Sequence, residues 1–186
     1  IATDGSTTIT PSAYSFNQTA GISILQYTGT GAVATLAHGL GAAPDAIFIK
    51  QTSAIRSWSC FNSRMDATAP EDYNIRINTD AAKDDSDGYW NDTLPDSVNF
   101  NLGSSADGNV SSGIYVAYCF TSIKGYSKFG FYPSVFDNDG PFVYTGFRPA
   151  FTLIKEAFGS NPWVIDDVKR EPINEIDKPL KPNNTD

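Results

Sequence analysis

The sequence predicts an all-β protein made of antiparallel, sandwich-like β-domains in tandem. Short apolar runs are separated throughout by clusters of Gly, Asp, Asn and Pro, a pattern typical of sandwiches and barrels. No amphipathic helical stretch of ten or more residues lies between these runs, which disfavours a parallel α/β fold. In addition, part of the sequence occurs twice.

The two copies keep a fixed spacing. Their opening glycines, Gly21 and Gly125, are 104 residues apart, so the second copy has one inserted residue near its start. Four matches in register, within similar hydrophobic patterns, indicate a repeated unit. We therefore expect residues 21–61 and 125–165 to share one strand arrangement. The matched residues, each pair 105 positions apart, are Gly41 and Gly146, Pro44 and Pro149, Lys50 and Lys155, and Trp58 and Trp163.

The repeat divides the chain. Residues 1–20 are expected to be a lead-in segment or linker, 21–124 a complete first β-domain and 125–186 a truncated second copy, since only 23 residues follow Trp163. The chain opens at Ile1 without an initiator Met, so we expect a piece of a longer polypeptide or its ordered part.

Each predicted strand is an apolar or alternating run bounded by turn residues. Gly31, Gly39 and Gly41 fit tight turns, and Pro44 and Pro149 favour an extended entry into the next strand. A single helical turn fits only near 79–83 or 95–97. The expected strands are 22–27, 33–37, 46–50, 58–61, 73–78, 98–102 and 114–120 in the first copy, then 126–132, 142–145, 151–155 and 163–168 in the second.

Composition and charge exclude several classes of protein. The net charge is −8, whereas a nucleic-acid groove needs clustered Lys and Arg. No run approaches the roughly 18–20 apolar residues that span a bilayer, and no signal-peptide pattern begins the chain. Abundant Ser, Thr, Asn and Gly with few Lys are typical of extracellular or virion β-proteins.

The residues able to carry nucleophilic chemistry are few. Cys60 and Cys119 lie in apolar strand-like runs and are expected to be small core residues, with a disulfide as the alternative. His38 is the one histidine, which makes a thiolate–imidazole zinc site improbable. As a general base it would need a nucleophile and an orienting acid. A turn-stabilising or surface role is expected instead.

Trp58 and Trp163 have two interpretations. A core tryptophan packing against the strand at 46–50, or its equivalent, is the first, and an exposed platform that stacks on a sugar is the second.

Two acidic clusters offer carboxylate oxygens around a Gly turn. Ca²⁺ prefers such ligands, but neither cluster supplies a twelve-residue loop closed by a bidentate Glu, and a solvated turn is the alternative. Paired carboxylates for glycoside hydrolysis cannot be nominated among so many acidic residues. The Ca²⁺ candidates are Asp84, Asp85, Asp87, Asp137 and Asp139; no other cofactor is expected.

Several longer motifs can be compared with known families. They are AGISILQYTGTG at 20–31 with HGLGAAPD at 38–45, YVAYCF at 115–120 with GYSKFG at 125–130, DGPFVYTGFRPAF at 139–151 and NPWVIDDVKR at 161–170. These motifs resemble the repeated β-domains of large proteins of tailed bacteriophages, especially cyanophages and other marine phages. The resemblance covers roughly residues 10 to 172.

The resemblance implies a virion location and a non-enzymatic structural role in a tail fibre, spike or other appendage. It brings no catalytic residues. Expected partners are other virion proteins and copies of the chain, in a trimer if the appendage needs a closed symmetric cross-section. Neither nucleic acid nor membrane insertion is expected. The alternatives are a module that binds a host-surface glycan or protein and, next, a capsid decoration protein or a fragment of a polysaccharide depolymerase.

Overall fold

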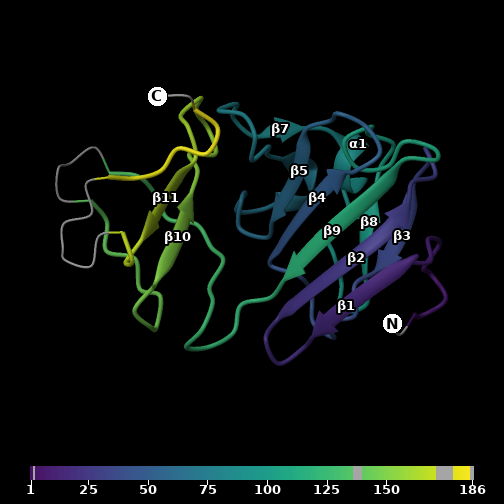
Figure 1. Cartoon of the computed structure of the whole chain (residues 1–186), viewed down its shortest axis with the longest axis horizontal. Coiled ribbons are helices and arrows are strands. Elements are labelled where there is room, and N and C mark those ends of the chain that lie inside the picture. Colours follow the sequence, from purple (N-terminus) through teal and green to yellow (C-terminus); the bar gives the residue numbers. More distant parts are fainter. Residues whose placement is uncertain (2, 136–139, 171–177, 185–186) are drawn as a thin grey trace.

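The computed structural model, which describes residues 1, 3–135, 140–170 and 178–184, is all-β (Figure 1). Its largest element is an antiparallel five-stranded sheet in the order β1-β2-β9-β4-β5. The long strands β2 and β9 pair over seven residues each, as their alternating apolar sequences require. The five strands are β1 (Ala13–Asn17), β2 (Ile22–Thr28), β9 (Ile114–Phe120), β4 (Ala46–Gln51) and β5 (Trp58–Asn62).

Three antiparallel pairs and two short helices complete the described fold. Asn91, in the left-handed region at φ 54°, ends the α-helix, and Ser86 caps its start by accepting from the Gly88 N–H. None of the helices in the described parts of the chain has the length and apolar character to cross a bilayer. The pairs are β3 (Ala34–Ala37) with β8 (Asn99–Leu102), β6 (Tyr73–Asn74) with β7 (Asp84–Asp85), and β10 (Phe151–Ile154) with β11 (Val164–Asp167); the helices are η1 (Pro70–Asp72) and α1 (Asp87–Trp90).

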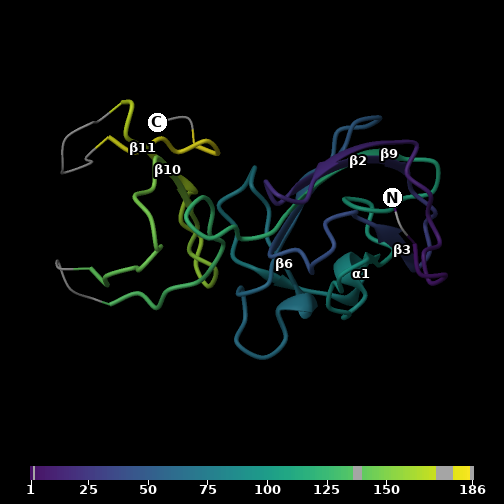
Figure 2. The same ribbon diagram turned by 90° about the horizontal axis from the view of Figure 1, so that it is seen from below.

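The main hydrophobic core lies against one face of the five-stranded sheet. Seen from below, the curved sheet containing β2 and β9 arches over β3 and α1 (Figure 2). Alternate residues of the strands point into this space, where they are withdrawn from water. The largest fully buried side chains include Leu25, Tyr27, Leu36, Ile47, Phe61, Trp90, Phe100 and Tyr115.

The opposite face of the sheet is also apolar but only half covered. We call it the outer face, and it presents Phe48, Trp58, Tyr118 and Phe120 as half-buried side chains. Phe48 meets Phe120 edge to face at 5.9 Å, and Trp58 meets Tyr118 at 6.3 Å. A sheet with apolar side chains on both faces needs a second covering layer, and part of that layer comes from residues after β9.

The structure corrects the expected boundary at residue 20. Residues 13–17 form β1, the edge strand of the main sheet, and Ile9 is buried in the core. The sequence predicts a lead-in or linker here because the repeated segment begins at Gly21. Residues 13–17 therefore belong to the main sheet. Below, "first unit" names residues 1–124 and "second unit" names the residues from 125 on.

Other differences concern short elements. Of the predicted strand at 73–78 only Tyr73–Asn74 forms, and the segments 126–132 and 142–145 are not strands. Helical turns form at Pro70–Asp72 and Asp87–Trp90, not at 79–83 or 95–97. Pro at a helix start and a Ser cap were the local signals that would have located them.

Candidate functional site: the repeated hairpin and its contact with the first sheet

The hairpin β10–β11 reproduces the register of β4–β5. Ile49 pairs with Ser59 in the first unit, and Ile154 pairs with Val164 in the second. Each residue of the second pair lies 105 positions after its counterpart. The predicted common strand arrangement is therefore confirmed for this hairpin, and the match extends to every described residue pair of β10–β11.

Bonds just outside the hairpin are repeated at the same spacing. The Ser63 N–H donates to the Asp45 carbonyl at 2.8 Å, and the Val168 N–H donates to the Ala150 carbonyl at 3.1 Å. On the other side, Cys60 and Ile75 exchange two backbone hydrogen bonds, as do Ile165 and Leu180. The structural repeat therefore extends to residue 180, well beyond the tryptophan where the sequence match was last evident.

Both tryptophans are anchored by the same kind of bond. The backbone N–H of Trp58 donates to the side-chain oxygen Oδ1 of Asn78 at 2.9 Å. The backbone N–H of Trp163 donates to Oδ1 of Asn183 at 2.8 Å. Asn78 and Asn183 are again 105 residues apart. The sequence comparison missed this pair because the matches it identified ended at Trp58 and Trp163.

The matched glycines and lysines also have matching roles. Gly41 and Gly146 have φ of +74° and +82°, a region that other residues adopt at a cost. Lys50 donates its ammonium to the Arg56 carbonyl, and Lys155 donates to the carbonyls of Glu156 at 2.7 Å and Gly159 at 3.0 Å. Each lysine thus hydrogen-bonds to backbone carbonyls in the loop that joins its two strands. Burial lowers the pKa of Lys155.

The repeat is partial on one side. In the first unit β4 pairs with β5 on one edge and β9 on the other. Within the described residues β10 pairs only with β11, and the counterpart of β2, near 126–132, forms no strand. Among the described residues, the structural repeat thus covers the β4–β5 hairpin.

Trp163 joins the two units. Its side chain is 7% exposed and packs with Cys60, Met65 and Ile75 of the first unit. The indole N–H donates to the Arg76 carbonyl at 2.8 Å. The predicted core role is confirmed in its burial, but the core is shared between units. Trp58 packs against the same cluster but is only half-buried, on the outer face beside Tyr118, so its predicted core role is met in part.

Lys83 makes a second link between the units. Its backbone N–H donates to the Ala157 carbonyl at 2.8 Å, and its ammonium lies 2.7 Å from the Asp66 carboxylate. The same ammonium lies 3.4 Å from the centre of the Tyr73 ring and 4.5 Å from that of Phe158. Bonds from Lys83, Thr68 and Ala69 hold the pKa of Asp66 well below its usual range.

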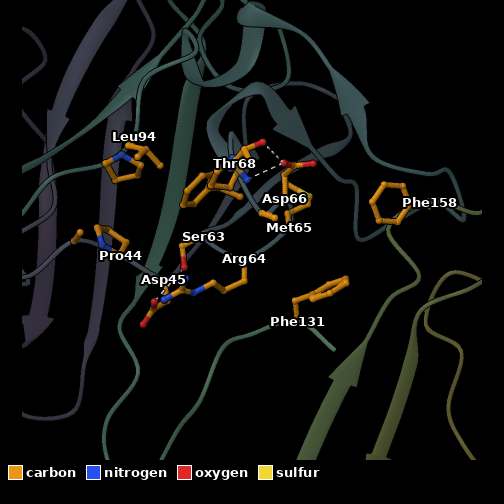
Figure 3. Close-up of a pocket in the computed structure, with 15 residues that line it drawn as sticks. Pro44, Asp45, Ser63, Arg64, Met65, Asp66, Thr68, Leu94, Phe131 and Phe158 are labelled. Carbon is orange, nitrogen blue, oxygen red and sulfur yellow. Dashed lines mark hydrogen bonds between the residues drawn. The ribbon is translucent and has the colours of Figure 1, made fainter. Parts of the chain in front are cut away.

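A hollow of about 700 Å³ lies beside this link (Figure 3). Phe131 and Phe158, from the chain after β9, line it together with residues of the first unit such as Pro44, Met65 and Leu94. The carboxylates in its wall are already bonded: Asp45 accepts from the Ser63 hydroxyl and the Ser122 N–H, and Asp66 from Lys83. The wall of the hollow is therefore mainly apolar, and its two carboxylates, Asp45 and Asp66, are already hydrogen-bonded within the protein.

His38 is held in the core by two bonds. Its side chain is fully buried, Nε2 lies 3.0 Å from the Asp96 carbonyl and Nδ1 accepts from the Leu40 N–H at 3.2 Å. This arrangement requires the neutral ring with its proton on Nε2, and burial lowers the pKa of His38. The turn-stabilising role is confirmed, whereas the surface location is wrong.

The two cysteines are free and buried, as the core interpretation predicts. Cys60 packs in the contact with Trp163, and Cys119 lies in the main core on the other face of the sheet. Burial raises the pKa of both thiols, so neither is an activated nucleophile.

The described acidic cluster, Asp84, Asp85 and Asp87, makes contacts within the protein. Asp84 pairs with Arg76 at 3.2 Å and accepts from the Tyr89 hydroxyl at 3.1 Å. Asp85 is in β7 and Asp87 begins α1. Among the residues the structure describes, no three His, Cys, Asp or Glu side chains gather as metal ligands. Asp137 and Asp139 lie outside the described residues.

Comparison with known proteins gives a family. The model of a domain of unknown function, DUF7483, matches residues 1–186. The chain belongs to the DUF7483 family. No curated protein and no solved structure matches this DUF7483 chain.

Proposed function

We propose that this DUF7483 chain is a non-enzymatic building block of a bacteriophage particle, located in a tail fibre, spike or other appendage. In this proposal the chain consists of sandwich-like units in tandem, of which the second is partial. The repeated hydrogen-bond pattern at a spacing of 105 residues carries the proposal, because tandem units add length and contact surface. The motif resemblance supplies the phage setting.

The uses of the polar residues support a structural role. His38 holds a turn, Asp66 and Lys83 hold one unit against the other, and Asp84 pairs with Arg76. In each case the group that could do chemistry is bonded within the protein. A building block that works by shape and contact fits this pattern.

The proposal is tested by locating the chain on particles. Antibodies raised against the 186-residue chain are applied to purified particles of the phage that encodes it, and bound antibody is located by electron microscopy. We expect label on the tail or an appendage. Label absent from particles, with the protein abundant in the non-particle fraction of the lysate, would contradict the proposal.

A second candidate function is recognition of a host-surface glycan. It is favoured by the half-buried aromatic pair of Trp58 and Tyr118 on the outer face, since aromatic faces stack on sugar rings. Glycan-array binding that Trp58→Ala abolishes, while Trp163→Phe retains it, would establish this function. An array without binding would leave the structural role as the sole candidate.

A further inference from the structure

The sequence repeat begins before its opening glycines. Residues 13–16 read AYSF and residues 117–120 read AYCF, at the same spacing of 104 that separates the glycines of the two copies. Gly21 and Gly125 both have positive φ, +65° and +79°, a region that other residues adopt at a cost. The match therefore covers one strand and the turn after it, and the second repeat begins within β9.

The strand that opens the second repeat completes the sheet of the first. β9 lies between β2 and β4, and it pairs with β2 over seven residues and with β4 over six. Its counterpart β1 pairs with β2 on the opposite edge, so the two strands with the same motif flank β2 (Figure 1). Both edges of β9 are thus occupied by strands of the first repeat, although its last four residues belong by sequence to the second.

After β9 the chain repeats the turn but not the hairpin. Ile123 and Ser127 exchange two backbone hydrogen bonds of 3.0 Å around Gly125. In the first repeat the chain turns at Gly21 and continues as β2 alongside β1. The segment that follows Gly125 cannot pair with β9 in this way, because β2 and β4 occupy both edges. The second repeat therefore contributes its opening strand to the sheet of the first.

The groove that receives β9 holds a small side chain on one face and large ones on the other. On the inner face Ala117 is fully buried, opposite Leu25 of β2 and Ile49 of β4. On the outer face Tyr118 and Phe120 pack with aromatic rings of β5 and β4. The alternation of the shared motif, Ala then Tyr and a second aromatic two positions on, fits these two faces.

We propose that the groove between β2 and β4 is a binding site for an extended strand of the Ala-Tyr-x-Phe type, and that consecutive repeats are joined by insertion of this strand. Backbone bonds on both edges hold the strand. At the two ends of the β4 ladder, the Asp45 N–H donates to the Phe120 carbonyl and the Thr52 N–H to the Ile114 carbonyl, each at 2.8 Å. The biological role rests on the proposed function, but strand binding is measurable on the isolated chain.

The first test supplies the strand as a separate peptide. A protease site is inserted between the exposed residues Ser111 and Ser112, and the chain is cut, unfolded in urea and refolded with an excess of labelled peptide 112–122. On size exclusion we expect the peptide to elute with the piece that ends at Ser111, and the piece that begins at Ser112 to be released.

Two peptide variants control this exchange. Tyr118→Pro removes an N–H on the edge that pairs with β4 and should abolish binding, whereas Tyr118→Ala keeps the N–H and should retain part of it. A peptide that stays free while the two pieces rejoin, or binding that Tyr118→Pro does not weaken, would overturn the proposal.

The second test uses the uncut chain. Amide hydrogen exchange is followed in Trp163→Ala, which loosens the contact of β10–β11 with the first unit. We expect the amides of β9 to keep the protection of those of β2 and β4, even where the hairpin loses its own. Loss of protection in β9 together with the hairpin would overturn the proposal. Failure to find label on particles would instead count against the phage setting alone.

Discussion

Trp163 donates its indole N–H to the backbone carbonyl of Arg76 over 2.8 Å, across 87 positions of the chain. The bond fixes the repeated hairpin against the first unit. A buried indole with a bonded N–H contributes both apolar area and a satisfied donor, so this residue is expected to dominate the contact.

Replacing Trp163 should therefore release the second unit. Trp163→Ala is expected to lower the free energy of unfolding by about 3–5 kcal/mol, because it leaves a cavity beside Cys60, Met65 and Ile75. Trp58→Ala should cost less, since Trp58 is half-buried on the outer face. Urea unfolding of both variants measures the difference. Equal losses would contradict the difference in burial between the two tryptophans.

The two asparagines that anchor the tryptophans should behave alike. Asn78→Ala and Asn183→Ala each remove an acceptor from a backbone N–H and should cost about 1 kcal/mol. Thermal unfolding of each variant gives the comparison. A loss for Asn78→Ala alone would show that the second unit lacks the repeated bond.

His38 should make the fold sensitive to mild acid. Burial lowers the pKa of folded His38 below its usual 6.5, so the unfolded chain takes up the proton first as the pH falls. The stability that the neutral ring contributes is complete above about pH 6.5 and declines as the pH falls through the folded pKa. Urea midpoints between pH 8 and 5 measure this slope.

His38→Gln is the control for that slope, because an amide does not titrate in this range. The variant should be less stable at pH 8, since the bonds to Leu40 and Asp96 change, and should show a flatter dependence on pH. An unchanged slope in His38→Gln would assign the dependence to other groups.

Asp66 should make the stability of the fold depend on pH in stronger acid than His38 does. Hydrogen bonds, first that from Lys83, lower its folded pKa, so its contribution is present above the unfolded pKa near 4 and is lost as the pH falls below it. Asp66→Asn should remove this part of the acid dependence and loosen the contact at Phe158. Limited proteolysis between pH 7 and 3 follows the second unit, and identical profiles for both proteins would refute the assignment.

Sequence periodicity was sufficient for most of the main sheet. Strands β2, β4, β5 and β9 alternate apolar and polar residues or carry buried apolar runs, and they form close to the predicted bounds. The repeat identified β10 and β11 because Lys155 and Trp163 keep the spacing of Lys50 and Trp58. Both the alternation and the repeated spacing can be read from a single sequence.

Long-range contacts were beyond sequence reasoning. The segment 126–132 has the alternation of β2 but forms no strand, so alternation alone did not decide whether a strand forms. The Lys83 link to Asp66 and Phe158 depends on how two units meet, which no local pattern encodes. Asn183 could have been found, since it lies 105 residues after Asn78.

The repeated hydrogen-bond pattern is the central claim, and amide hydrogen exchange followed by NMR tests it most directly. Protection of the Ile75, Ser63 and Trp58 amides should be matched by protection of their counterparts Leu180, Val168 and Trp163, since each pair makes the same bond. Exchange of the three second-unit amides at the rates of an unstructured chain, with the first three protected, would contradict the claim.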